Sequence, residues 1–152
     1  MKTAMFVLVL ATLSAAPGDS ERSATPDALP VTPSSVLRVS PQTVHFGTRQ
    51  IGTFNLKSAK ITNTSSQTVN LFVEGSSLPD DWSFGILPGS TAPVFEPAPF
   101  APGESCRAVV GFRPSEFWAG QPQHAQLLVT ATDPITNEVL ETALIDFIGT
   151  GQ

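Results

Sequence analysis

The chain has 152 residues, with 8 Lys and Arg against 13 Asp and Glu, which gives a formal net charge of -5. This acidic balance argues against a nucleic-acid partner, because binding to a phosphate backbone needs clustered cations. The 14 prolines and 11 glycines are too many for a helical protein. A hydrophobic content of 41% is enough for the core of one domain.

The N-terminal segment, residues 1–18, has the pattern of a secretory signal peptide. Lys2 precedes an apolar run over 4–13 that is too short to span a bilayer as a helix, and small residues follow at 14–16. An uncleaved membrane anchor or a chance apolar start is the alternative. We expect a secreted, periplasmic or cell-surface protein with no stable membrane anchor after cleavage; the alternative location is cytoplasmic.

The folded domain is expected over residues 37–152, after a disordered spacer. Residues 19–36 are rich in Pro, Ser and Thr and show no apolar period. Residues 37–40 then alternate between apolar and polar side chains, Pro41 interrupts the alternation, and 43–46 resume it. We expect the two halves of this first strand to pair with different sheets.

Phe46 is predicted to anchor the core between two bends. Gly47 directly follows it, and Gly52 admits the next apolar run. Glycine takes a positive φ without steric cost, so each of these positions can turn a strand.

The next two strands are predicted over 54–62 and 69–73. The turn formers Asn63-Thr64-Ser65-Ser66 separate them, which favours a hairpin. Asn63-Thr64-Ser65 also matches a glycosylation acceptor, but a turn is the preferred interpretation. Trp82, Phe84 and Ile86 indicate a short fourth strand.

A long connection, residues 87–104, carries five prolines, which exclude a central strand. Part of it is expected along a sheet edge. It is either a functional loop or a passive crossover. The dipeptide Pro102-Gly103 predicts a turn at its end.

The fifth strand places Cys106, Ala108, Val110 and Phe112 on one face and Gly111 on the exposed face, and Arg113-Pro114 ends it. A single cysteine excludes an intramolecular disulfide. Cys106 is interpreted as a small buried hydrophobe, with an intermolecular or reactive thiol as the alternative. Two further strands are predicted over 125–132 and 138–148, and Gly149 and Gly151 close the last one.

The loop over 115–123 contains the adjacent aromatics Phe117 and Trp118. In an extended segment neighbours point to opposite sides. We expect Phe117 to face the core and Trp118 to face outward as a tentative binding residue, since its indole N–H favours a polar neighbour. In the alternative, both rings cover the end of the domain as a lid.

No catalytic or metal-binding pattern is present, so no enzyme activity, cofactor or metal is predicted. His45 and His124 lie on different predicted strands and are interpreted as surface residues. No nucleophile motif accompanies them, and the acidic residues are too sparse for a calcium loop. A shared exposed sheet is possible for four cations, Lys57, Lys60, Arg107 and Arg113. A solvated face is the default interpretation, with a phosphate or acidic-motif site as the alternative.

Short strands separated by turn signals predict an all-β, immunoglobulin-like sandwich of seven to eight antiparallel strands. Six motifs in order resemble the ASH-type (abnormal spindle, Hydin) immunoglobulin-like domain and the bacterial choice-of-anchor D domain, relatives of major sperm protein and PapD-like domains. They are Leu37-Arg38-Val39-Ser40-Pro41, Phe46-Gly47 with Gly52, Ile61-Thr62-Asn63, Pro102-Gly103-Glu104-Ser105, Phe112-Arg113-Pro114 and Gly149-Thr150-Gly151.

The resemblance implies an interaction or structural module, because the family has no common catalytic residues to carry over. The expected function is therefore a non-enzymatic, extracytoplasmic module that binds an unknown protein partner. An accessory carbohydrate-binding domain is one alternative, for which Trp118 and its neighbour supply the exposed aromatics. An intracellular ciliary or centrosomal scaffold domain is the other.

Overall fold

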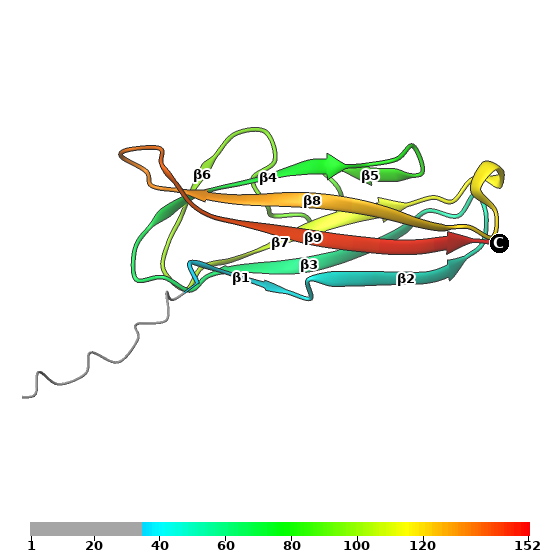
Figure 1. Ribbon diagram of the computed structural model, residues 1–152, viewed down its shortest axis with the longest axis horizontal. Helices are drawn as coiled ribbons and strands as arrows, with labels where there is room; N and C mark the ends of the chain where they lie inside the picture. The colour runs from blue at the N-terminus through cyan, green and yellow to red at the C-terminus, as the bar shows by residue number, and fades with distance from the viewer. Residues whose placement is uncertain (1–34) are drawn as a thin grey trace, which may run out of the picture. The chain divides into compact units, whose positions relative to one another are not determined.

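The computed structural model describes residues 35–152, which form a sandwich of two β-sheets (Figure 1). The predicted signal peptide over 1–18 and residues 19–34 of the predicted spacer lie outside the described residues. Ser35 and Val36 are described, and the Val36 carbonyl accepts a hydrogen bond from the Thr64 N–H. Within residues 35–152, no helix is long and apolar enough to cross a membrane.

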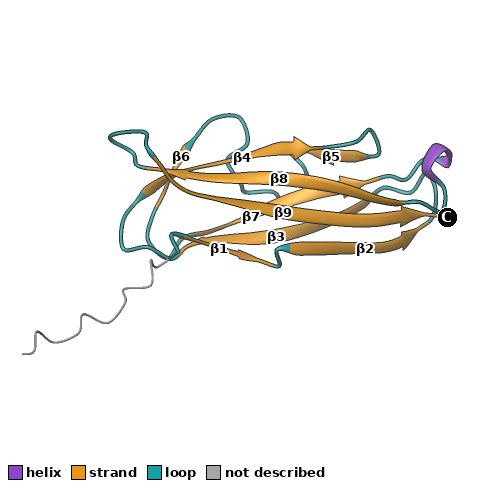
Figure 2. Cartoon of the chain, viewed as in Figure 1, coloured by secondary structure: helices purple, strands orange, loops and turns teal. Residues whose placement is uncertain are grey.

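One sheet has four strands in the order β1-β3-β7-β5: β1 (Leu37–Ser40), β3 (Asn55–Asn63), β7 (Ser105–Phe112) and β5 (Trp82–Phe84). The other has five in the order β2-β9-β8-β4-β6: β2 (Thr43–Arg49), β9 (Val139–Gly151), β8 (Pro122–Thr132), β4 (Val69–Ser77) and β6 (Ala98–Phe100). A single 3-10 turn, η1 (Glu116–Trp118), interrupts the strands in the described part of the chain (Figure 2).

The predicted immunoglobulin-like sandwich is confirmed, with two differences of detail. The described residues form nine strands instead of seven or eight, because the first strand counts as two and one short edge strand, β6, is added; β5 is the predicted fourth strand. The pair β2 and β9 is parallel. A parallel pair needs a long crossover, and here nearly the whole domain lies between the two strands.

The expected exchange of the first strand between sheets is confirmed. β1 pairs with β3 in the four-stranded sheet, and β2 pairs with β9 in the five-stranded sheet. Pro41 lies at the switch, where its missing N–H costs neither ladder a hydrogen bond.

The predicted hairpin between the second and third strands is wrong. β3 pairs with β1 and β7, whereas β4 pairs with β6 and β8 in the opposite sheet. Both strands bury alternate residues in the same core, but they do so from opposite sides. A short polar loop between two alternating runs is compatible with an arch between sheets as well as with a hairpin, so the local pattern could not distinguish them.

The centre of the core is an aromatic cluster around Phe46, which is 2% exposed. Its ring meets Trp82 edge-on at 5.3 Å and Phe112 at 5.5 Å between centroids, and Trp82 stacks on Phe112 at 4.3 Å. Such pairs add stability beyond the buried area. Cys106 is also buried in this core, as predicted.

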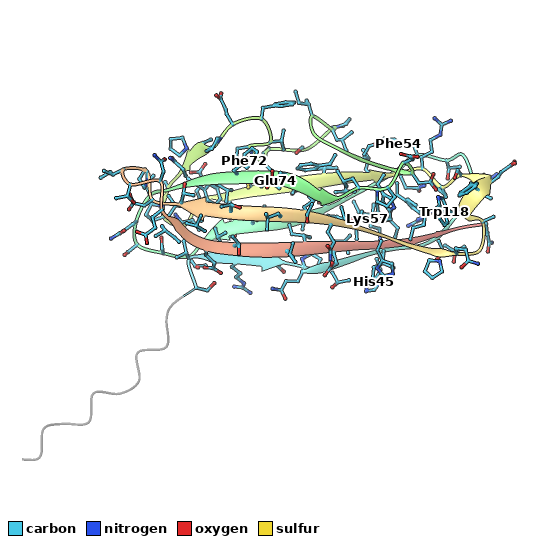
Figure 3. All side chains as sticks on the ribbon, turned by 45° about the horizontal axis from the view of Figure 1, so that its top comes forward. His45, Phe54, Lys57, Phe72, Glu74 and Trp118 are labelled. Atoms are coloured by element: carbon cyan, nitrogen blue, oxygen red, sulfur yellow. The ribbon has the colours of Figure 1, made fainter. Side chains whose placement is uncertain are left out.

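Lys57 connects the two sheets through its side chain. It lies on β3 opposite Val110, a core residue, so its side chain points to the inner face. Its Nζ donates a hydrogen bond to the His45 carbonyl of β2 at 2.5 Å (Lys57 and His45 are labelled in Figure 3). The same atom lies 5.9 Å from the centroid of the Phe46 ring. The expectation that Lys57 shares one exposed sheet face with the other cations is therefore wrong.

Gly111 is not on an exposed face, as the sequence had indicated, but is buried. The ring of Phe54, itself 52% exposed, folds over it, and a Cβ at position 111 would lie 2.4 Å from the Phe54 Cζ atom. Strand alternation correctly placed Gly111 opposite the core face. The Phe54 side chain, from the segment before β3, covers Gly111 through a tertiary contact. Strand alternation cannot predict such a contact.

The proline-rich connection follows a sheet edge, as predicted. Its residues Ala98–Phe100 form β6, which pairs with β4 at the border of the five-stranded sheet. Before that, the N–H groups of Thr91 and Ala92 bond to the Arg107 carbonyl of β7, and the Pro93 carbonyl accepts the Val73 N–H of β4. The connection thus joins the two sheets along one side of the sandwich.

Candidate binding site

The most exposed aromatic pair in the described residues lies on η1, which we call the aromatic turn (Glu116–Trp118). Phe117 is 83% exposed and Trp118 is 44% exposed. The two rings contact each other edge-to-face, with centroids 4.9 Å apart. The turn lies at the end of the sandwich that also holds the C-terminus (Figures 1 and 2).

The expectation that Phe117 packs inward is wrong, whereas Trp118 faces outward as expected. The expectation assumed an extended segment, in which neighbours alternate between two sides. The segment instead forms a 3-10 turn in which no residue is buried. Neither ring covers the core, so the lid arrangement is not observed either.

Backbone hydrogen bonds hold the aromatic turn against the end of β9. The Gly120 N–H donates to the Gly151 carbonyl at 2.8 Å, and Ala119 forms a single parallel bridge with Gly151. The Gln121 N–H donates to the Trp118 carbonyl at 3.0 Å. Gly120 has a φ of +74°, a conformation that favours glycine. The two rings are therefore presented on an anchored backbone.

A buried carboxylate supports this end of the sandwich. Asp81 accepts hydrogen bonds from the Ser115 N–H at 2.9 Å, the Ser115 hydroxyl at 3.2 Å and the Gln123 amide at 2.8 Å. Burial by itself raises the pKa of Asp81, but these three hydrogen bonds together outweigh it and hold the pKa below its ordinary value. The ionised carboxylate thus ties the start of the aromatic turn to β8.

A shallow hollow of about 180 Å³ lies beside Trp118, lined by Pro79, Trp118, Pro122, Gln123 and His124. Two prolines and an indole form an apolar wall, and an amide and an imidazole add polar groups. This combination suits a proline, aliphatic or aromatic side chain of a partner. Among residues 35–152, no group of three His, Cys, Asp or Glu side chains is placed to hold a metal ion.

The glycines of the family-like motifs take the positive φ angles expected of bends. The φ angles are +68° at Gly47, +81° at Gly52 and +74° at Gly103. The two terminal glycines have a different role. A Cβ at Gly149 would lie 2.5 Å from the Phe112 ring, and one at Gly151 would lie 2.6 Å from Pro114. The absence of a side chain at Gly149 and Gly151 therefore leaves space for Phe112 and Pro114, which belong to the motif that ends β7.

Asn63 joins three segments of the fold. Its Nδ2 donates to the carbonyls of Gln67 and Phe100, both at 2.9 Å, and its Oδ1 accepts from the N–H and hydroxyl of Ser65. Its side chain is fully buried. These contacts confirm the turn interpretation over a glycosylation acceptor, because the amide nitrogen is already used inside the protein.

Other exposed apolar side chains were not recognised from the sequence. Phe95, in the proline-rich connection, is 76% exposed and lines an open hollow of about 330 Å³ together with Ile86. Ile86 was expected on the fourth strand beside Trp82 and Phe84. That part of the prediction is wrong, because β5 ends at Phe84 and Ile86 is 82% exposed. The exposure of Phe95 could have been predicted from the sequence, since a connection that carries a large apolar residue between prolines has no strand on which to bury it. The two predicted surface histidines, His45 and His124, are exposed as expected.

No family model matches the chain, and no curated protein sequence matches it. Solved structures do match. PapD-like domain 7 of human CEP192 is 13% identical with a TM-score of 0.54, over 99% of this chain and 98% of that one. WR4, a C. elegans MSP family member, is 12% identical with a TM-score of 0.52, over 76% of this chain and 99% of that one. The E. coli chaperone DraB is 12% identical with a TM-score of 0.51, over 74% of this chain and 53% of that one.

These likenesses define the class of the fold. The domain has an immunoglobulin-like sandwich fold that is similar to those of an MSP family member, a PapD-like domain and a chaperone, in agreement with the resemblance of the six motifs. At such low identities the comparison concerns the fold alone, and the site must be argued from the side chains of this chain.

Proposed function

We propose that this chain is a non-enzymatic, extracytoplasmic module that binds a protein partner through the aromatic turn. The observation that carries the proposal is the 83% exposure of Phe117 next to the partly exposed Trp118 on an anchored backbone. Large exposed aromatics are enriched where partners dock. Because the turn is already ordered, binding loses little conformational entropy.

The fold supports a module of this kind. Its structural neighbours include an MSP family member, a PapD-like domain and a chaperone. The aromatic end offers an apolar hollow with few polar groups, which fits the side chain of a partner better than it fits a reaction centre.

Site-directed photo-crosslinking tests the proposal. The full chain is produced in its source cells with p-benzoylphenylalanine in place of Phe117, and in a control in place of Ile135. Ile135 is 88% exposed but lies in the β8–β9 turn, at the opposite end of β8 (Figure 1). We expect a defined protein adduct at 117 and none at 135, lost when Trp118→Ala is added. Equal yields at both positions would contradict the proposal.

A glycan array separates the carbohydrate-binding alternative. If the chain captures a defined glycan and Trp118→Ala abolishes the capture, the aromatic turn stacks on sugar rings. That result would mean that the ligand of the aromatic turn is a carbohydrate and not a protein.

The extracytoplasmic location rests on the N-terminal sequence, and it is tested separately. N-terminal sequencing of exported material should begin between Ala15 and about Ser23. Recovery of the chain with an intact Met1 in the soluble cytosolic fraction would contradict export and leave the aromatic turn untouched.

A further inference from the structure

Charge is divided unevenly between the two sheets. The strands of the four-stranded sheet contain four cations, Arg38, Lys57, Lys60 and Arg107, and no Asp or Glu. The strands of the five-stranded sheet contain one cation, Arg49, and three acids, Glu74, Glu141 and Asp146. In a chain of net charge -5, the four-stranded sheet is therefore a locally cationic surface.

Three of these cations occupy neighbouring positions on the outer face. Lys60 of β3 is directly opposite Arg107 of β7, and on its other side it is opposite Ser40 of β1. Arg38 lies one row further along β1, on the diagonal from Lys60. Like charges in directly opposite positions are destabilising, and diagonal neighbours remain within reach of long side chains. An anion placed between the three side chains would relieve this repulsion.

Hydroxyl groups complete the same surface. Arg38 is opposite Thr62, whose Oγ1 lies 2.8 Å from the Ser105 Oγ in a shared hydrogen bond. A hollow of about 360 Å³ is lined by Arg38, Ser40, Lys60, Thr62 and Thr64. Guanidinium, ammonium and hydroxyl groups around one hollow are the donors that phosphate and sulfate oxygens accept.

The nearby carboxylates are already engaged elsewhere. Both oxygens of Glu141 accept hydrogen bonds from the start of the domain: Oε1 from the Ser35 hydroxyl, and Oε2 from the N–H groups of Val36 and Leu37. Glu104, just before β7, accepts the Ala101 N–H at 2.7 Å. The hydrogen bonds of both carboxylates thus come from donors other than Arg38, Lys60 and Arg107.

We propose that the outer face of β1 and β3 binds a tetrahedral oxyanion, a phosphate or sulfate ester, in the hollow between Arg38 and Lys60, with Arg107 of β7 opposite Lys60 as a third cation beside it. A tetrahedral oxyanion presents three or four acceptor oxygens to the several donors of this hollow, whereas a carboxylate presents only two. A phosphate monoester is close to doubly charged at neutral pH, which matches a cluster of cations better than the single charge of a carboxylate does. This site is separate from the aromatic turn and does not depend on the proposed function.

Nuclear magnetic resonance titration of the full chain tests this site. Inorganic phosphate, sulfate and acetate are added in turn at constant ionic strength, so that general screening stays unchanged. We expect saturable shifts of backbone amides over 38–40, 60–64 and 105–107 with phosphate and sulfate, and much weaker ones with acetate. Phosphoserine and a monosaccharide sulfate are then compared, and the tighter ligand identifies the ester that the site takes.

Matched variants locate the binding. Arg38→Gln with Lys60→Gln should weaken the phosphate response at least about tenfold, because charge-assisted hydrogen bonds are lost. Arg113→Gln is the control: Arg113 is exposed beyond the end of β7, where its Nε donates to the Gly52 carbonyl. Circular dichroism checks that both variants stay folded. The proposal is overturned if the shifts do not saturate, if acetate equals phosphate, or if Arg113→Gln weakens the response as much as the double variant.

Discussion

The ring of Phe112 occupies the space that a side chain at position 149 would need. An ideal Cβ on Gly149 lies 2.5 Å from the Phe112 Cε1 atom. Phe112 is fully buried and stacks on Trp82, so the ring has little room to move. The contact joins the end of β7 to the end of β9 across the sandwich, and it gives a steric reason for the glycine.

Gly149→Ala should therefore destabilise the domain by about 1–3 kcal/mol through overpacking. Chemical denaturation measures the loss. The matched test is the double variant Gly149→Ala with Phe112→Leu, in which the smaller side chain leaves room for the new methyl group. Its loss should be smaller than the sum of the two single losses. Strict additivity would show that the ring does not cause the strain.

Gly47 should resist substitution for a different reason. Its φ is +68°, and nothing lies within 4 Å of an added Cβ, so the penalty is backbone strain without a clash. Gly47→Val should cost about 1–3 kcal/mol in denaturation experiments. The neighbouring exposed Thr48 is the control, and Thr48→Val should stay within about 0.5 kcal/mol of wild type. Equal denaturation midpoints for Gly47→Val and wild type would show that the positive φ at position 47 does not require glycine.

The two tryptophans should respond very differently to truncation. Trp82 is 5% exposed and packs against Phe46 and Phe112, so Trp82→Ala should cost about 3–5 kcal/mol. Trp118 is 44% exposed, and Trp118→Ala should cost about 1 kcal/mol or less. Urea titrations of both variants make the comparison. A loss at Trp118 as large as that at Trp82 would assign it to the core and weaken its case as a binding residue.

The Asp81 carboxylate should make stability depend on pH. Its pKa in the folded protein is lowered, so its contribution is present above the unfolded pKa of about 3.9 and is lost as pH falls through the folded value. Asp81→Asn should be less stable than wild type at neutral pH. The difference in the free energy of unfolding between the two proteins should become smaller as pH falls below about 4. Urea denaturation of both proteins across the acid range measures this. If this difference in stability does not change with pH, the ionised Asp81 carboxylate does not stabilise the fold.

The single thiol should be inert in the folded protein. Burial, followed by the negative charge of Glu104, raises the pKa of Cys106 to about 11. The reagent DTNB at mildly alkaline pH should therefore react at least about a hundredfold more slowly with the folded chain than with the urea-unfolded chain. Fast reaction with the folded chain would mean that β7 opens locally or that Cys106 is accessible.

The amino-acid sequence by itself determined the class of fold, the split first strand, the position of Phe46 in the core and the bends at Gly47 and Gly52. Each of these follows from a local rule, because strand alternation and the φ preferences of Gly and Pro act within a few residues. Only the tertiary structure decided the rest. It placed β3 and β4 in different sheets, because two alternating runs can bury the same core from either side. It exposed Phe117, because a 3-10 turn removes the alternation that had been expected to bury it. It also brought Arg38, Lys60 and Arg107 together from three strands, because cross-strand register depends on pairing between distant parts of the chain, and no local pattern encodes that pairing.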